Sequence, residues 1–140
     1  MAEYISTATQ TVAVNQNVIF SDTVICGNSS ITHRTDSGLV TIKGITNQCR
    51  ARFKITFGGN IAIPSTGTVA PISLAIAVDG EAINSTTMIE TAAAVSQFHN
   101  VSSTVFIDVP CGCCNQISVQ NTSTQPISVA NANLIVERVA

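Results

Sequence analysis

The chain has 140 residues and a net charge of −2 at neutral pH, from six lysines and arginines against eight aspartates and glutamates. Charged residues make up 10% of the chain, compared with about 25% of an average soluble domain. No cluster of basic residues could neutralise a nucleic-acid backbone, which argues against nucleic-acid binding. Abundant β-branched aliphatic residues argue against disorder, so we expect one compact, β-rich domain spanning residues 1–140.

The first ten residues lack the basic start and the apolar run of a signal peptide, so we expect no secretion signal. They can instead form an extended N-terminal arm. No window of the chain approaches the roughly 18 uninterrupted apolar residues of a membrane-spanning helix, so we expect no contact with a membrane.

The clearest strand signal is a period-two alternation of apolar and polar residues between residues 49 and 57. One face of this strand consists of Cys49, Ala51, Phe53, Ile55 and Phe57, and the other of Arg50, Arg52, Lys54 and Thr56. The following residues, Gly58, Gly59 and Asn60, predict a tight turn, because glycine accepts the positive φ that such turns require. We expect residues 61–63 to begin the return strand.

Two later segments alternate in the same way. The first has an inward face of Ile72, Leu74, Ile76 and Val78, and Asp79 and Gly80 predict a tight turn at its end. The second has an inward face of Val101, Ser103, Val105, Ile107 and Val109, and Pro110 and Gly112 close it.

Further strands are predicted at residues 11–20, 24–26, 39–45, 116–121 and 127–139. In the last of these, the apolar residues change parity between Val129 and Ala132, which predicts a β-bulge at residues 131–133. Residues 82–99 fit either a short strand or a helical turn.

About eight to ten short strands separated by Gly, Pro, Asn and Ser turns are typical of a two-sheet antiparallel sandwich of the jelly-roll type. A barrel and an immunoglobulin-like sandwich are the alternatives. The Cys-Trp-Cys pattern of immunoglobulin domains is missing, since the chain has no tryptophan.

The second face of the strand at residues 72–78 carries Ser73, Ala75 and Ala77, which are small and uncharged. A strand that faces solvent normally carries Lys, Glu, Arg or Thr there. We therefore predict that this face is covered, and in a sandwich without helices the cover is a second copy of the chain. A solvated face of small residues is the alternative.

Five cysteines are present, of which Cys111, Cys113 and Cys114 lie within four residues. Structural zinc sites use pairs of ligands spaced as Cys-x-x-Cys with a second matching pair, and this spacing does not fit. We therefore expect no metal and no cofactor. Free thiols are the first interpretation of this cluster, and disulfides within or between chains are the second.

The histidines and serines offer no recognisable catalytic arrangement. His33 and His99 are too far apart in the sequence for a cupin-type metal site, and no Gly-x-Ser-x-Gly motif is present. We expect a protein that is not an enzyme, with no catalytic residues.

Three of the six positive charges, Arg50, Arg52 and Lys54, form a stripe on one face of a strand, about 7 Å apart. An ordinary solvated face is the first interpretation of this stripe, and a contact with carboxylates of a partner is the second. Sugar binding by ring stacking has little support, because Tyr4 is the single Trp or Tyr residue.

The segments 11–20, 44–53, 72–80 and 131–139 resemble a family of small proteins encoded by tailed phages and prophages of anaerobic gut bacteria. The similarity covers nearly the whole chain. The layout is also similar to the jelly rolls of the tumour-necrosis-factor and complement type, which assemble as tight trimers.

These resemblances imply a non-enzymatic structural protein of the virion, such as a capsid decoration protein, a head fibre or a tail-associated component. They also imply a homotrimer that is made in the bacterial cytoplasm and has other virion proteins as partners. A receptor- or glycan-binding head domain of a fibre is the alternative.

Overall fold

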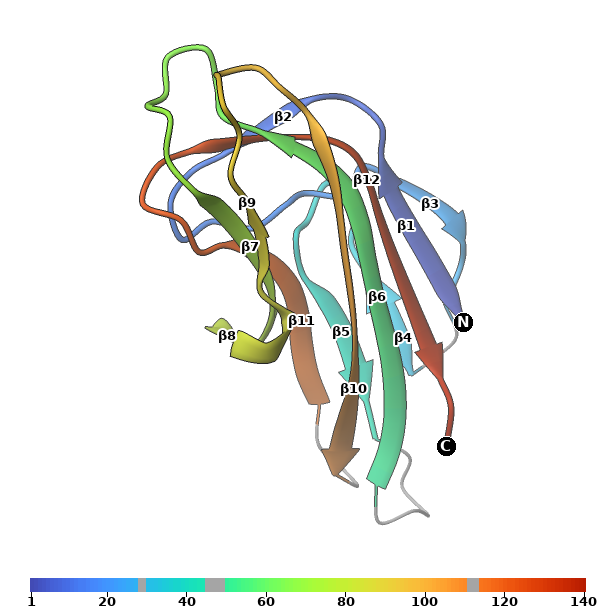
Figure 1. The fold of residues 1–140 in the computed structure, drawn as a ribbon. Helices are drawn as coiled ribbons and strands as arrows, with labels where there is room; N and C mark the ends of the chain where they lie inside the picture. The colour runs from blue at the N-terminus through green and yellow to red at the C-terminus, as the bar shows by residue number, and fades with distance from the viewer. Residues whose placement is uncertain (28–29, 45–49, 111–113) are drawn as a thin grey trace.

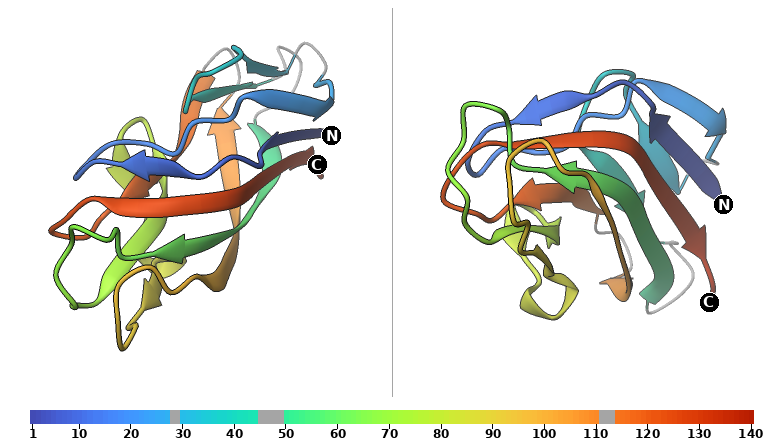
Figure 2. Two further views of the ribbon diagram at one scale, coloured as in Figure 1. Left: turned by 90° about the horizontal axis from the view of Figure 1, so that it is seen from above. Right: turned by 45° about the horizontal axis from the view of Figure 1, so that its top comes forward.

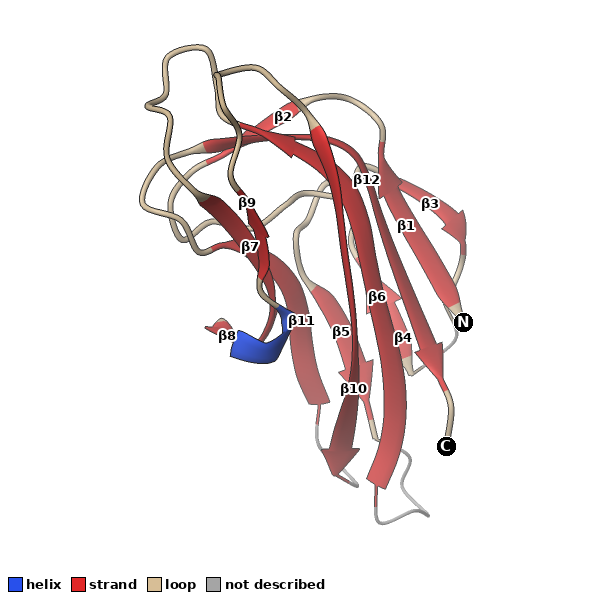
Figure 3. Ribbon diagram, in the orientation of Figure 1, coloured by secondary structure: helices blue, strands red, loops and turns tan. Residues whose placement is uncertain are grey.

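The computed structural model describes residues 1–27, 30–44, 50–110 and 114–140. In these residues the chain is built of strands and one short 3-10 helix, η1 (Asn84–Thr86), as Figure 3 shows. The strands are β1 (Ala2–Ser6), β2 (Gln10–Val12), β3 (Asp22–Ile25), β4 (Ile31–His33), β5 (Val40–Lys43), β6 (Arg50–Ala62), β7 (Ile72–Val78), β8 (Glu81–Ala82), β9 (Met88–Glu90), β10 (His99–Pro110), β11 (Cys114–Asn121) and β12 (Ile127–Arg138).

The strands form two antiparallel sheets (Figures 1 and 2). The first sheet has the order β10-β6-β12-β1-β3, and β2 also pairs with β12. The second sheet has the order β4-β5-β11-β7-β8, and β9 also pairs with β7. The predicted two-sheet antiparallel sandwich is confirmed. No helix in the described residues has the length and apolar character needed to cross a membrane.

The core lies between the two sheets and is built from the predicted inward faces. On β6, Phe53, Ile55 and Phe57 are fully buried, and Leu74 and Ile76 of β7 are buried opposite them in the same cluster. Full burial of one such side chain stabilises the fold by about 1.5–3 kcal/mol. The inward face predicted for β10 is also confirmed at Ile107 and Val109, which are buried.

Two predicted irregularities are present. Asp79 and Gly80 both have positive φ, 52° and 85°, and form the tight turn between β7 and β8. The register between β12 and β6 shifts between Ala130 and Asn133, and Asn131 has a φ of 54°. The bulge predicted at residues 131–133 is therefore confirmed.

The turn predicted at Gly58, Gly59 and Asn60 is wrong, because β6 runs without interruption to Ala62. Neither glycine has positive φ, and both pair with β10. At Gly59 the physical reason is close packing: a Cβ atom there would lie 3.2 Å from Phe57 Cζ and 3.4 Å from Ala132 Cα, in the bulge of β12. A glycine in a strand allows this close approach of a neighbouring backbone.

The N-terminal half differs from the sequence prediction in three places. Residues 2–6 do not form a separate arm but are strand β1, which pairs with β12 and β3. The strand predicted at residues 11–20 is limited to β2, because the chain turns at Asn15, which has a φ of 62°. Strand β4 was not predicted, because its three residues are too few to show a period.

Residues 82–99 contain both predicted alternatives, the helical turn η1 and the strand β9.

Candidate interaction surface

The predicted basic stripe lies on the outer face of the first sheet. Strand β6 alternates strictly, so Arg50, Arg52 and Lys54 point away from the core while Ala51 and Phe53 are buried in it. Strands β10 and β12 flank β6 on its two edges. The stripe therefore lies next to side chains that come from two distant parts of the chain.

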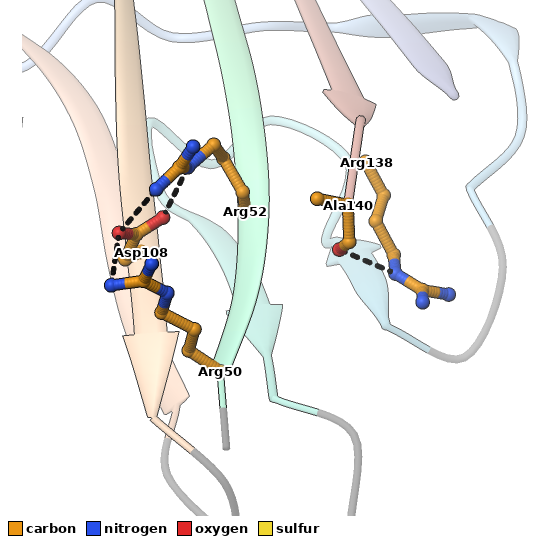
Figure 4. A network of polar contacts seen from close by, with 5 residues as sticks. All are labelled: Arg50, Arg52, Asp108, Arg138 and Ala140. Carbon is orange, nitrogen blue, oxygen red and sulfur yellow. Dashed lines mark hydrogen bonds and ion pairs between the residues drawn. The ribbon is translucent and has the colours of Figure 1, made fainter. Parts of the chain in front are cut away.

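Asp108 of β10 binds two residues of the stripe (Figure 4). It lies directly opposite Arg52 in the antiparallel register. Arg52 Nε donates to Asp108 Oδ1 at 2.7 Å and Nη2 donates to Oδ2 at 3.1 Å, while Arg50 Nη1 lies 3.5 Å from Oδ2. The planar guanidinium matches the carboxylate in this two-bond geometry.

The hydrogen bond from Arg52 lowers the pKa of Asp108 below its ordinary value, and the same bond raises the pKa of Arg52. Both side chains are partly exposed, with 41% for Arg52 and 34% for Asp108, so water and salt weaken their interaction. Two of the three stripe residues thus have a carboxylate partner inside the chain. Whether the stripe also meets carboxylates of a partner stays a prediction.

Lys54 has a different environment from the two arginines. Its neighbours across the strands are Phe106 of β10 and Glu137 of β12. Phe106 points outward with 59% of its surface exposed. A shallow hollow of about 270 Å³ is lined by Arg52, Phe106 and Asp108. An exposed aromatic ring beside guanidinium groups is a composition that protein interfaces favour.

The middle of the same face is open. Gly58 lies between Ser102 of β10 and Asn133 of β12, and a Cβ atom on Gly58 would have no heavy atom within 4 Å. Two residues before it, on the same face, Thr56 forms a hydrogen bond of 3.2 Å with Thr104 of β10 through their hydroxyls. The sheet therefore presents a row of short side chains here, although Gly58 itself was predicted to be in a turn.

The face continues onto β1, where Glu3 pairs with Ile135 and Ile5 pairs with Asn133. Asn133 Nδ2 donates a hydrogen bond to a Glu3 carboxylate oxygen. Both isoleucines are half-buried. This part of the surface was not found from the sequence, because it depends on the pairing of the two ends of the chain.

Ser73, Ala75 and Ala77, the predicted oligomer interface, lie on the outer face of the second sheet. Ala75 and Ala77 have 0% exposure within the single chain. The hydroxyls of Ser73 and Thr122 form a hydrogen bond of 2.6 Å. The edge of β7 is closed by β8, η1 and β9, with the Thr86 hydroxyl accepting from Ile76 N at 2.9 Å. The two alanines thus need no second copy to be buried, and the oligomer interface at these residues stays a prediction.

The cysteine cluster is described only in part. Cys111 and Cys113 lie outside the described residues, as does Cys49, and Cys114 is exposed at the start of β11. Among the described residues, no group of three His, Cys, Asp or Glu side chains could hold a metal ion. His33 Nε2 donates to the carbonyl oxygen of Ser37 at 2.8 Å, and the His33 ring packs against the Tyr4 ring with 4.5 Å between their centroids. His99 lies 3.7 Å from Glu90.

Comparison with known proteins identifies the fold. No protein-family model and no curated protein matches the sequence. The globular domain of zebrafish complement 1qA protein superposes with a TM-score of 0.64 and 12% identity, over 96% of this chain and 94% of that one. Murine APRIL at pH 5.0 superposes with a TM-score of 0.62 and 8% identity, over 97% of this chain and 98% of that one.

The PRD1 vertex protein P5 has the same fold, with a TM-score of 0.55 and 11% identity over 99% of this chain and 96% of that one. The chain is therefore an all-β jelly roll of the C1q/TNF-like type, and this prediction is confirmed. Identities this low establish the fold alone. Membership in the gut-phage family stays a prediction, because no sequence family is identified.

Proposed function

We propose that this protein is a non-enzymatic structural component of a phage particle, a capsid decoration, head-fibre or tail-associated protein that assembles as a homotrimer. The observation that supports it most is the similarity to the PRD1 vertex protein P5, which extends over 99% of this chain and 96% of the other. The similarity therefore extends over the whole fold unit in both chains.

The surface fits a protein that works by contact. The hollow at Arg52 is shallow, and the basic stripe is held in place by Asp108 rather than arranged around an enclosed cavity. A wide sheet with a tightly packed core presents such a surface rigidly. Rigid presentation is what a particle component needs to bind neighbours in a fixed geometry.

The fold also supports self-assembly. Folds of the C1q/TNF-like type typically form trimers, and this chain matches two of them over more than nine-tenths of its length. In a closed assembly each copy contributes to the same set of contacts, so a single small protein can form a stable unit.

Glycan binding is a second candidate because of one further feature. A hollow of about 520 Å³ is lined mostly by hydroxyl and amide side chains, those of Thr11, Ser65, Thr66, Thr68, Gln125 and Ser128, together with Pro64, Gly67 and Pro126. The Gln125 amide holds the loop in place, accepting from Thr68 N at 3.0 Å and donating to Thr68 O at 2.8 Å. A fixed polar hollow of this kind could hydrogen-bond to a sugar.

The experiment is to purify particles from an induced culture and to locate the protein by mass spectrometry and by imaging with a specific antibody. We expect a fixed number of copies per particle at one position. Absence of the protein from washed, infectious particles would overturn the proposal. Binding of the purified protein to host glycans, abolished by Gln125→Ala, would favour the second candidate instead.

A further inference from the structure

We propose that a hollow on the outer face of the second sheet binds an acidic sugar, with the sugar carboxylate on Arg34 and the ring hydroxyls on a row of polar side chains. The hollow has a volume of about 470 Å³, which lies within the range of about 300–1,000 Å³ of small-molecule sites. It shares no lining residue with the hollow at Gln125. Binding of a sugar here goes beyond the proposed role in the particle and requires neither that role nor the homotrimer.

The floor of the hollow is a row of three polar side chains across β4, β5 and β11, which are neighbours in the second sheet (Figure 1). Thr32 lies opposite Thr41, and Thr41 lies opposite Gln116. All three point away from the core, since the isoleucine next to each of them is buried. Residues directly opposite in an antiparallel pair have their Cβ atoms about 4.5–5.5 Å apart. The hydroxyls and the amide therefore form one continuous row.

The side chains of this row are available to a ligand. Within the described part of the chain, no hydrogen bond engages the side chain of Thr32, Thr41 or Gln116. In the other hollow, by contrast, the Gln125 amide is already bonded to the backbone of Thr68. Hydroxyl and amide groups both donate and accept, as a sugar hydroxyl does. The row can therefore bond to neighbouring hydroxyls of one ring.

Arg34 gives the hollow a permanent positive charge. It makes no ion pair with any described carboxylate. Lys43 adds a second positive charge on the same outer face of β5, and β4, β5 and β11 carry no aspartate or glutamate. Asp36 and Asp79 do not line the hollow, and Asp79 accepts from the backbone N of Gln116 at 2.9 Å. A guanidinium binds a planar carboxylate through two parallel hydrogen bonds, so an anionic ligand fits this position.

The wall that carries Arg34 is held in place before any ligand binds. Ser37 N donates to Arg34 O at 3.0 Å and closes a turn. The carbonyl oxygen of Ser37 accepts from Phe20 N at 3.3 Å and from His33 Nε2 at 2.8 Å. Phe20 is fully buried, so the turn is tied to the core. A ligand therefore loses little affinity in ordering this loop.

The whole lining fits a sugar better than a simple anion. Besides Arg34 it offers the neutral polar row and the side chain of Leu39, which is 36% exposed. A phosphate has no use for the apolar contact, whereas the C–H groups of a sugar ring pack against it. A few placed polar groups beside an apolar side chain fix the orientation of such a ligand. Stacking on a tryptophan or tyrosine is not needed here.

The test is a titration of the isotope-labelled protein followed by NMR. Sialyllactose and trigalacturonate are the acidic sugars, which differ in their rings. Lactose and the methyl ester of trigalacturonate are the matched neutral ligands. Triglutamate and inorganic phosphate are the anions without a sugar ring. Amide resonances of Thr32, Thr41 and Gln116 report on the hollow, and those of Thr68 and Gln125 report on the other one.

We expect the acidic sugars to shift the resonances of the hollow, and every other ligand to bind at least about tenfold more weakly, because it lacks either the charge or the ring. Arg34→Gln should raise the dissociation constant about tenfold or more, because a charge-assisted pair of bonds is lost. Thr41→Val keeps the shape of the side chain and removes one neutral hydrogen bond, so we expect an increase of about threefold or more. Arg138→Gln is the control, since it makes the same change on β12 of the first sheet and should leave binding unchanged.

The proposal is overturned if neither acidic sugar shifts the resonances of the hollow. It is also overturned if a neutral ligand, triglutamate or phosphate binds there as tightly, or if Arg34→Gln binds as the wild type does. Shifts confined to Thr68 and Gln125 would place the sugar in the other hollow, and this inference would fail. None of these outcomes affects the proposed role in the particle, which is tested by locating the protein in purified particles.

Discussion

Arg52 and Asp108 form a two-bond ion pair across neighbouring strands, although they lie 56 positions apart in the chain. Each is the direct cross-strand neighbour of the other in the register of β6 and β10. The pair fixes how the basic stripe is presented on the outer face of the first sheet.

The pair predicts a specific pH dependence. The hydrogen bond from Arg52 lowers the pKa of Asp108 in the folded protein, compared with about 3.9 for an unfolded aspartate. The stabilisation is therefore present above about pH 4 and is lost as the pH falls through the lower, folded pKa. We expect the free energy of unfolding of Asp108→Asn to fall less steeply than that of the wild type below about pH 4.

Urea unfolding at a series of pH values measures this difference. Because the pair is partly exposed, about 1 M NaCl should reduce the difference in pH dependence between the wild type and Asp108→Asn. Parallel pH profiles of the two proteins at low salt would contradict the role assigned to Asp108.

Asn121 is predicted to be important for stability. Its side chain is fully buried; the amide donates to the carbonyls of Val12, Ala13 and Gln125, and its oxygen accepts from Ser123 N. Asn121→Ala would leave buried carbonyls without donors, so we expect a loss of about 3 kcal/mol in the free energy of unfolding. Asn100→Ala is the control, because that side chain is exposed and makes one bond, to Asn60. Equal losses in the two variants, measured by urea unfolding, would refute the prediction.

The two adjacent glycines of β6 should respond differently to alanine. At Gly59 the new methyl group would press on the buried Phe57 ring and on the backbone of Ala132. We expect Gly59→Ala to lower the free energy of unfolding by about 1–3 kcal/mol. At Gly58 the space is open, so we expect Gly58→Ala to stay within about 0.5 kcal/mol of the wild type. Thermal unfolding at one fixed protein concentration tests both, and a reversed order would be inconsistent with the packing described.

Tyr4 should ionise only at unusually high pH. It is 2% exposed, and burial raises the pKa of its phenol, with a smaller contribution from nearby Cys26. Since the folded pKa is raised, the stabilisation is present below about pH 10 and is lost as the pH rises through the folded value. Tyr4 is the only tyrosine and there is no tryptophan, so ultraviolet absorbance follows this group alone. Ionisation near pH 10 in the still folded protein, with a wild-type near-ultraviolet spectrum, would show that the ring is not buried.

The sequence predicted the sandwich because alternation is a local signal. Residues 51–57 on β6 show period two because one face is buried in the core and the other faces outward. The bulge at residues 131–133 was also visible, since the change of parity between Val129 and Ala132 lies within one strand. Information of this kind needs no knowledge of neighbouring strands.

The features that the sequence did not predict depend on contacts between segments that are distant in the chain. Gly59 was assigned to a turn because glycine is typical of turns, whereas its role is to accommodate the bulge of β12 about seventy residues later. The pairing of Asp108 with Arg52 depends on a register that no local pattern shows. The burial of Ala75 and Ala77 within the single chain likewise depends on elements that are distant in the sequence, and the contact with a second copy predicted there stays a prediction.

The proposed homotrimer is tested most directly by the molar mass of the wild-type protein in solution, measured by light scattering during size-exclusion chromatography at micromolar concentration. We expect a single species of three times the 14.6 kDa of the chain, which persists on tenfold dilution. A single species of 14.6 kDa would contradict the homotrimer.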